Sequence, residues 1–161
     1  MLLRGLYDED FINYKKPSMF LIFPYCSLKC NIEAGIDCCQ NQELYKANYL
    51  NIEIDDIINR YLNNDISQAI VCGGLEPFDS ANELITLIQT LREKYHCSDD
   101  IVIYTGYNEF EIKNKIDYLK KFKNIIIKFG RYIPNSKSKF DEVLGVTLAS
   151  DNQYAVNLDK E

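Results

Sequence analysis

The sequence contains no apolar stretch long enough to cross a membrane, and its first residues do not resemble a secretion signal. A membrane-spanning helix needs about 20 consecutive, mostly apolar residues, and charged residues interrupt the apolar runs of this chain well before that length. The opening segment MLLRGLYDEDFINYKK places acidic residues where a signal peptide carries its apolar run. We therefore expect a soluble, cytoplasmic protein with no membrane partner.

The chain also lacks an excess of positive charge. Its 18 lysine and arginine residues are outnumbered by 24 acidic residues, which gives a net charge of −6. A protein that binds nucleic acid through the phosphate backbone needs a basic surface that displaces counterions. The lysines of residues 113–123 lie beside Glu109, Glu111 and Asp117, a mixture typical of a solvated helix face. No nucleic-acid partner is therefore expected.

No linker or low-complexity segment interrupts the 161 residues, which predicts one domain over residues 1–161. A domain of this length buries enough apolar surface to be stable without disulfide bonds. Thiols stay reduced in the cytoplasm, so clustered cysteines are interpreted as metal ligands or redox groups before disulfides.

Apolar runs alternate with helical patterns along the chain. The runs predict strands, whereas apolar residues at helical spacing predict helices between them. Strands that alternate with helices indicate an α/β fold with a parallel sheet. The predicted strands are 19–23, 69–72, 101–104 and 124–129, with less regular extended segments at 144–150 and 154–158. The predicted helices cover 52–62, a segment that starts at Ser80 with a Ser80/Glu83 capping box, and a segment that starts at Asn108 with Glu111 as its partner.

An unusual loop follows each of the four main predicted strands. The loops begin with CSLKC at Cys26, CGGLEPF at Cys72, YTGY at Tyr104 and FGRYIPN at Phe129. Parallel strands end at the same edge of a sheet, where ligands of α/β proteins bind. We therefore expect the four loops to form one site.

Four of the six cysteines lie in the first of these loops. Cys26 and Cys30 can face one metal centre across three intervening residues, and either Cys38 or Cys39 can supply a third ligand. Three cysteines leave one iron of an iron-sulfur cluster open to an outside ligand. Four thiolates on one zinc ion, or a set of redox thiols, remain alternatives. Cys72 ends a strand and is interpreted as a small buried hydrophobe.

The chain as a whole resembles small radical S-adenosylmethionine (SAM) proteins of the type that activates anaerobic ribonucleotide reductase. The usual loop of that family has a C-x3-C-x2-C pattern, whereas here the third cysteine follows a longer gap. Cys39 directly precedes Gln40 and Asn41, and the resemblance implies that Cys26, Cys30 and Cys39 hold a 4Fe-4S cluster. Five segments carry the resemblance, in the order of the family: residues 26–41, 73–77, 104–107, 127–134 and 144–153.

The same resemblance implies that SAM is the second cofactor. Gly73 and Gly74 would allow close backbone approach to SAM because they have no Cβ atom. Glu76 would lie at the methionine end, although Leu75 displaces it by one residue from the usual GGEP motif. Thr105 and Lys128 complete the expected SAM-binding set. A simple turn at the glycines and a helix cap at Thr105 remain alternatives. Arg131 either meets the SAM carboxylate or an acidic residue of a partner protein, or is a surface residue.

The activity that the resemblance implies is reductive cleavage of SAM at the cluster and formation of a glycyl radical on anaerobic ribonucleotide reductase. The electron would come from a donor such as flavodoxin or ferredoxin. The expected fold is a partial (β/α) barrel with an open parallel sheet, because the predicted β/α units are too few to close a barrel. The open side favours a protein substrate. A radical SAM enzyme with another protein, peptide or small-molecule substrate, and a non-enzymatic metal-binding module, remain alternatives.

Overall fold

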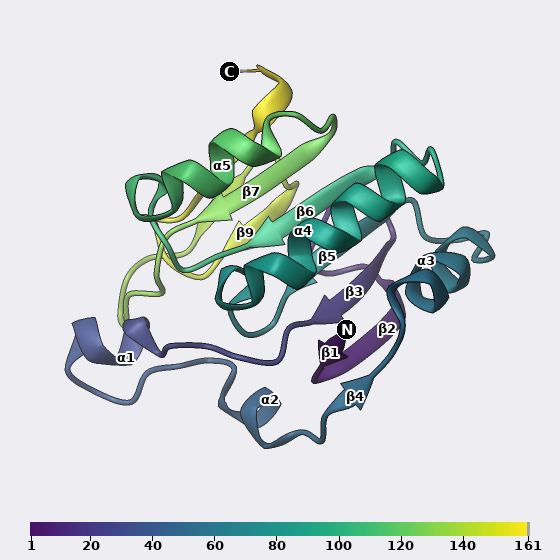
Figure 1. Cartoon of the computed structure of the whole chain (residues 1–161). Helices are drawn as coiled ribbons and strands as arrows, with labels where there is room; N and C mark the ends of the chain where they lie inside the picture. The colour runs from purple at the N-terminus through teal and green to yellow at the C-terminus, as the bar shows by residue number, and fades with distance from the viewer. Residues whose placement is uncertain (161) are drawn as a thin grey trace.

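A six-stranded sheet forms the centre of the computed structural model, which describes residues 1–160. Its strand order is β10-β7-β6-β5-β3-β2, and Figure 1 shows helices across one face of it. The strands are β2 (Gly5–Asp10), β3 (Ser18–Ile22), β5 (Ala69–Gly73), β6 (Asp100–Tyr104), β7 (Ile125–Phe129) and β10 (Tyr154–Asn157).

The four strands predicted from apolar runs form the middle of this sheet and are parallel. Strand β3 pairs with β5, β5 with β6, and β6 with β7. Every residue of β5 and of β7 is buried, because strands in the middle of a covered sheet have no solvent-facing side. The prediction of an α/β fold is therefore confirmed.

The two edges of the sheet differ from the predicted open parallel sheet. Strand β2 pairs with β3 antiparallel, and β10 pairs with β7 antiparallel, so the sheet is mixed. The sheet is open, as expected, since β2 and β10 stand at opposite ends of the strand order, and its six strands show no barrel. Strand β2 was not expected because its sequence, GLYDED, is mostly polar. Half-buried and exposed residues alternate along most of β2, as in an edge strand with one solvated face.

Helices cover one face of the sheet and form the larger core. These are α3 (Ile54–Leu62), α4 (Ala81–Gln89), which continues into a π-helical turn (Thr90–Lys94), and α5 (Lys113–Leu119). Leu84, Leu87 and Ile88 of α4 are buried against this face, at the helical spacing that predicted them. Figure 1 shows α4 and α5 side by side in front of β5, β6 and β7.

A short hairpin and an irregular segment cover the other face. Strands β8 (Lys139–Asp141) and β9 (Val146–Leu148) pair antiparallel. Leu144 and Leu148 of this hairpin and Tyr14 of the segment after β2 pack on Val71, Val102 and Ile126 of the sheet. This second core covers the sheet away from the helices.

The two predicted helix starts have different outcomes. Helix α4 begins next to Ser80, but the Ser80 side chain makes no capping bond, and Glu83 accepts a hydrogen bond from the Leu2 N–H instead. The prediction of a Ser80/Glu83 capping box is therefore wrong. At Asn108, the Glu111 carboxylate accepts the Asn108 N–H at 2.8 Å, as a capping box requires, and a 3₁₀ turn (Glu109–Ile112) leads into α5.

The remaining elements are short and lie at the ends of the sheet. Strands β1 (Leu2–Leu3) and β4 (Leu50–Asn51) pair with each other. Two short helices, α1 (Lys29–Ala34) and α2 (Gln42–Lys46), belong to the segment between β3 and β4, and 3₁₀ turns cover Pro77–Ser80 and Leu158–Lys160. In the described residues, no helix is long and apolar enough to cross a membrane.

Candidate functional site

The cysteine loop leaves the carboxyl end of β3 and doubles back over the ends of the parallel strands. Two residues with left-handed backbone make the reversal possible, Leu28 at φ 53° before α1 and Gly35 at φ 67° after it. Cys30 lies on α1, whereas Cys38 and Cys39 lie on the returning segment. In Figure 1, α1 and α2 lie beyond the arrowheads of β3 and β6, on the side where the strands end.

Hydrogen bonds attach this loop to the loop after β5. The Glu76 N–H donates to the Tyr25 carbonyl at 2.8 Å, next to Cys26. The Asn41 side-chain amide donates to the Gly74 carbonyl at 2.6 Å, next to Gln40 and Cys39. Both ends of the cysteine segment are thus bonded to the GGLEP motif.

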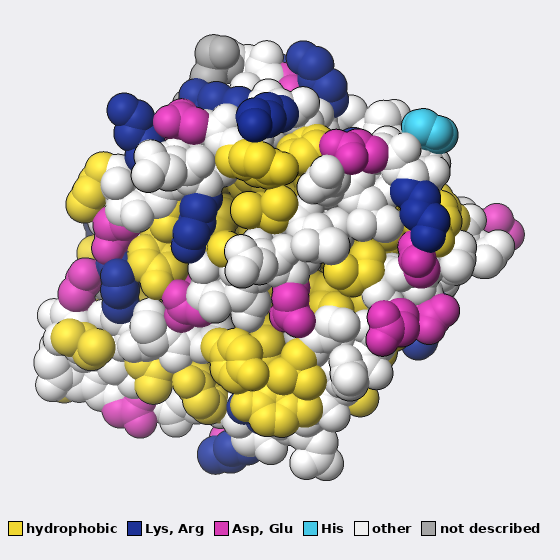
Figure 2. Space-filling view, in the orientation of Figure 1, with side chains coloured by type: hydrophobic (Ala, Val, Ile, Leu, Met, Phe, Trp, Pro, Cys, Tyr) yellow, Lys and Arg dark blue, Asp and Glu magenta, His cyan; other side chains and the backbone are white. Residues whose placement is uncertain are grey.

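An aromatic patch lies beside Cys26 on the outer surface. It consists of the partly exposed side chains of Tyr25, Tyr45 and Tyr49 with the Arg4 guanidinium stacked 3.8 Å from the Tyr49 ring centre. Figure 2 shows the apolar side chains gathered on this face over α2. The Tyr45 hydroxyl donates to the Cys26 carbonyl at 2.8 Å, so the patch also fixes the start of the cysteine loop.

Three of the four clustered cysteines line one cavity of about 380 Å³. They are Cys26, Cys30 and Cys39, the residues that the sequence analysis selected. The cavity lies at the carboxyl ends of the parallel strands, and its wall includes Gly74, Glu76, Thr105, Gly106, Lys128 and Gln153. Four of the five predicted SAM-binding residues therefore share a cavity with the three cysteines, and only Gly73 does not line it.

Cys38 does not line this cavity. Its thiol lies 3.5 Å from the Cys30 carbonyl and 3.6 Å from the Asn31 side-chain oxygen, and its N–H donates to the same oxygen at 3.0 Å. Asn31 in turn donates to Asp37 at 2.7 Å. The polar contacts of Asn31 thus turn Cys38 toward the backbone and leave Cys39 on the cavity wall.

The Cys26 thiol is mostly buried. Burial raises its pKa to about 11, and the negative charges of Glu76 and Asp79 act in the same direction. The Leu28 N–H donates to its sulfur at 3.3 Å, which opposes the shift. A buried sulfur with an N–H donor is suited to bind a metal centre, because coordination by a cation replaces the lost solvation of the thiolate.

Glu76 organises the loops after β5 and β6 despite the extra Leu75. One carboxylate oxygen accepts the Thr105 hydroxyl at 2.8 Å and the Phe78 N–H at 3.1 Å, and the other accepts the Gly106 N–H at 2.8 Å. Burial raises the pKa of Glu76 to about 7, and these three donors oppose that rise. Leu75 is itself buried, so the insertion is absorbed by the fold while Glu76 still reaches the third loop.

Lys128 brings a buried ammonium group to the opposite wall of the cavity. It is 7% exposed, and its Nζ donates to the Gly130 carbonyl at 3.0 Å. Burial lowers its pKa to about 8, and the charges of Glu76 and Cys30 oppose this shift. In the described residues, Lys128 has no carboxylate within salt-bridge distance, so it is available to an anionic ligand.

The two glycines of the GGLEP motif have separate structural roles. Gly73 ends β5, and a Cβ atom there would come within 3.1 Å of Tyr104 and 3.3 Å of Phe20. Gly74 has φ +78°, and a Cβ atom would lie 2.6 Å from Ile22. A side chain is thus excluded at Gly74 and would crowd its neighbours at Gly73. The Gly73 carbonyl accepts the Phe23 N–H, and the Gly74 carbonyl accepts the Asn41 amide.

Arg131 is not a surface residue. It is 6% exposed and forms two hydrogen bonds to the Glu111 carboxylate. Its Nε also lies 3.1 Å from Glu33 on α1, an ion-pair contact whose geometry does not make a hydrogen bond. Since α1 buries none of its residues, these charges hold it beside the site.

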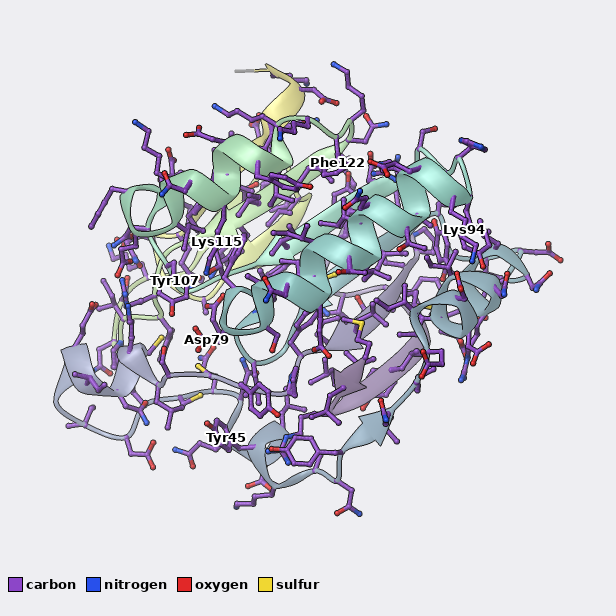
Figure 3. The ribbon with its side chains drawn as sticks, in the orientation of Figure 1. Tyr45, Asp79, Lys94, Tyr107, Lys115 and Phe122 are labelled. Atoms are coloured by element: carbon purple, nitrogen blue, oxygen red, sulfur yellow. The ribbon has the colours of Figure 1, made fainter. Side chains whose placement is uncertain are left out.

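The sequence analysis did not select Asp79, and it included Tyr107 only as part of the YTGY loop. Asp79 and Tyr107 lie side by side in Figure 3, and the Tyr107 hydroxyl donates to Asp79 at 2.6 Å. Gly106 of the same loop supports the site through its N–H, which donates to the Glu76 carboxylate at 2.8 Å. Asp is common in ordinary loops, so only the position of Asp79 shortly after the GGLEP motif could have suggested a role.

The chemistry of the cavity is that of a thiol-lined site next to polar groups. All six cysteines are free. In residues 1–160, no group of three or more histidine, cysteine or acidic side chains is gathered as a site for one metal ion. The three cavity cysteines instead line the same cavity as the buried carboxylate of Glu76 and the buried ammonium group of Lys128.

Comparison with known families identifies the class of this α/β protein. Residues 18–154 match the family described as a 4Fe-4S single cluster domain. No curated protein and no solved structure matches the chain. The match covers most of the sequence and includes all cavity cysteines, and the chain therefore belongs to the 4Fe-4S single cluster domain family. The free thiols on the cavity wall fit such a cluster, because cysteine thiolates are its usual ligands.

Proposed function

We propose that this protein is a radical SAM enzyme that reductively cleaves SAM and generates a glycyl radical on anaerobic ribonucleotide reductase. The observation that carries the proposal is the shared cavity. It brings three cysteines together with Gly74, Glu76, Thr105 and Lys128 at the ends of the parallel strands. The four parallel strands with their helices support the partial-barrel interpretation of the fold.

Cys26, Cys30 and Cys39 would hold the cluster through three of its irons. A cluster with three cysteine ligands has one iron free for an exogenous group. When bound, the cluster would supply the electron for cleavage of the SAM sulfonium. The Leu28 N–H at the Cys26 sulfur would stabilise the negative charge of the sulfur ligand.

The remaining cavity residues would bind and orient SAM. Lys128 presents a buried positive charge that would attract the SAM carboxylate, and such a pair is strengthened by low solvent access. The Glu76 oxygens are already bonded to Thr105, Gly106 and Phe78. Glu76 would therefore act by fixing the loop after β6 and by placing negative charge near the SAM amino group.

The size of the cavity agrees with a small-molecule cofactor. Its volume of about 380 Å³ lies within the usual range of about 300–1,000 Å³ for ligand sites. Phe20, Tyr104, Tyr132 and Leu148 supply apolar wall that would exclude water from a bound ligand.

The cavity also reaches the surface, which supports a large substrate. Ile12 lines the cavity and is 78% exposed. An exposed apolar residue at the opening would be covered if a protein completes the site. We propose that the reductase is that protein, that a flavodoxin or ferredoxin supplies the electron, and that the reaction takes place in an anaerobic cytoplasm.

Anaerobic reconstitution followed by SAM cleavage tests the proposal. Protein loaded with iron and sulfide, reduced and mixed with SAM should release 5′-deoxyadenosine. Addition of the anaerobic reductase encoded with this protein should produce a glycyl radical signal in electron paramagnetic resonance spectra. SAM cleavage without that signal would reject the activase and leave a radical SAM enzyme with another substrate. A reconstituted cluster with no SAM cleavage would reject radical SAM chemistry and favour a binding module.

A further inference from the structure

Asp79 connects the cysteine loop to the loop after β6. Its carboxylate accepts the backbone N–H of Ser27 at 2.7 Å through one oxygen. The other oxygen accepts the Tyr107 hydroxyl at 2.6 Å. Ser27 directly follows Cys26, so Asp79 fixes the backbone next to a cysteine of the cavity.

The Asp79 carboxylate has only neutral hydrogen-bond partners in the described residues. None of the salt bridges found between residues 1 and 160 includes it. Two lysines of the neighbourhood are engaged elsewhere. Lys115 donates to the Phe78 carbonyl at 3.0 Å, and Lys29 pairs with Glu111 at 3.4 Å. No ion pair therefore neutralises the Asp79 charge.

This charge lies close to the start of the cysteine loop. The carboxylate accepts the N–H of Ser27, the residue directly after Cys26, at 2.7 Å, which places its charge within electrostatic range of the Cys26 segment. Asp79 is half-buried, so water screens the interaction less than on an open surface.

We propose that Asp79 is a positioning residue that fixes the Cys26 segment and whose unpaired negative charge lowers the reduction potential of the cluster. Reduction adds an electron, and a nearby negative charge makes that addition less favourable. The net charge near a cluster and the hydrogen bonds around its sulfur atoms are known determinants of its potential. This inference rests on the proposed cluster site but not on SAM or on the identity of the protein substrate.

Asp79→Asn removes the negative charge of residue 79 but allows its two hydrogen bonds to remain. An asparagine oxygen can still accept the Ser27 N–H, and its amide can donate to the Tyr107 oxygen. We expect the variant to retain the iron and sulfide content of the wild type and to show a more positive midpoint potential in an anaerobic redox titration. Asp79→Ala removes both bonds, and we expect it to lose a large part of the iron as well.

Asp159→Asn is the matched control. Asp159 also accepts a backbone N–H, from Asn124 at 2.8 Å, but it lies at the amino end of β7 and does not line the cavity of Cys26, Cys30 and Cys39. Its replacement should leave the potential unchanged. Tyr107→Phe keeps the Asp79 charge and removes one bond, so it should leave the potential close to that of the wild type.

The outcomes distinguish the inference from the proposed function. A cluster in Asp79→Asn with the same potential as the wild type would overturn the inference and leave the cluster site intact. Loss of iron in Asp79→Asn equal to that in Asp79→Ala would also overturn it, because the amide retains the bonds that the proposal assigns to positioning. A wild-type protein that forms no 4Fe-4S cluster would instead overturn the proposed function.

Discussion

Arg131 and Glu111 form a two-point ion pair across the site, with Nη1–Oε2 at 2.8 Å and Nη2–Oε1 at 2.7 Å. The pair joins the loop after β7 to the turn before α5. Glu33 of α1 contacts the same guanidinium, so one arginine links three segments that are far apart in the sequence.

Replacement of Arg131 by glutamate should destabilise the whole fold. Two carboxylates would then face each other where a buried cation now lies, and loss of one partner of a buried pair costs about 3 kcal/mol or more. Urea denaturation followed by circular dichroism measures the free energy of unfolding. Glu43→Gln is the control, since the exposed Lys46–Glu43 pair should contribute less than about 1 kcal/mol. Equal effects of the two variants would show that the Arg131 pair is not structural.

The same pair should make the protein sensitive to acid. The Arg131 guanidinium lowers the pKa of Glu111 from 4.5 to about 2. Because the folded-state pKa lies below the unfolded value, the stabilisation is complete above about pH 4.5 and is lost as the pH falls toward 2. The urea midpoint of the wild type should therefore fall more than that of Glu111→Gln between pH 6 and pH 3. Parallel pH profiles would contradict this prediction.

The third cluster ligand can be identified by alanine replacement. Cys39 lines the cavity and Cys38 does not, so Cys39→Ala should abolish the cluster whereas Cys38→Ala should retain it. Cys72 is fully buried in the core, and Cys72→Ala should also retain the cluster. Iron and sulfide analysis after anaerobic reconstitution measures the result. Iron loss in Cys38→Ala alone would assign the ligand to Cys38.

Gly74→Ala should destabilise the fold rather than block SAM alone. The new methyl group would lie 2.6 Å from Ile22 and 3.2 Å from Leu44, and the residue would keep a left-handed backbone. Overpacking of this kind costs about 1–3 kcal/mol, in addition to the backbone strain. Gly35→Ala is the matched control, because Gly35 has a similar φ of +67° and no atom within 4 Å of the added carbon. If both variants lose the same free energy of unfolding, the contact with Ile22 is not significant.

The apolar sequence pattern predicted the centre of the fold well but not its edges. Strands β3, β5, β6 and β7 are continuous apolar runs because both of their faces are covered. Strand β2 has the acidic residues Asp8, Glu9 and Asp10, which a local pattern does not associate with a strand. Phe110 shows the opposite error, since it fits the helical face of the sequence but is 78% exposed in the turn before α5.

The sequence predicted which loops form the candidate site, but not which side chains contact one another there. The loops were expected to meet, and in the structure Cys26, Cys30, Cys39, Gly74, Glu76, Thr105 and Lys128 line one cavity. The sequence could not show that Gly73 lies behind this wall. Nor could it show that Arg131 is buried, because its partner Glu111 is separated from it by 20 residues.

By itself the sequence determined the order of the strands along the chain and the edge at which their loops meet, because parallel strands must end on the same side of a sheet. The tertiary structure alone decided which side chains face the cavity. Cys38 turns to Asn31 while Cys39 remains on the wall, and Glu76 reaches Thr105 and Gly106 despite the inserted Leu75. These directions depend on left-handed turns and on hydrogen bonds between distant segments, which no local pattern of residues encodes.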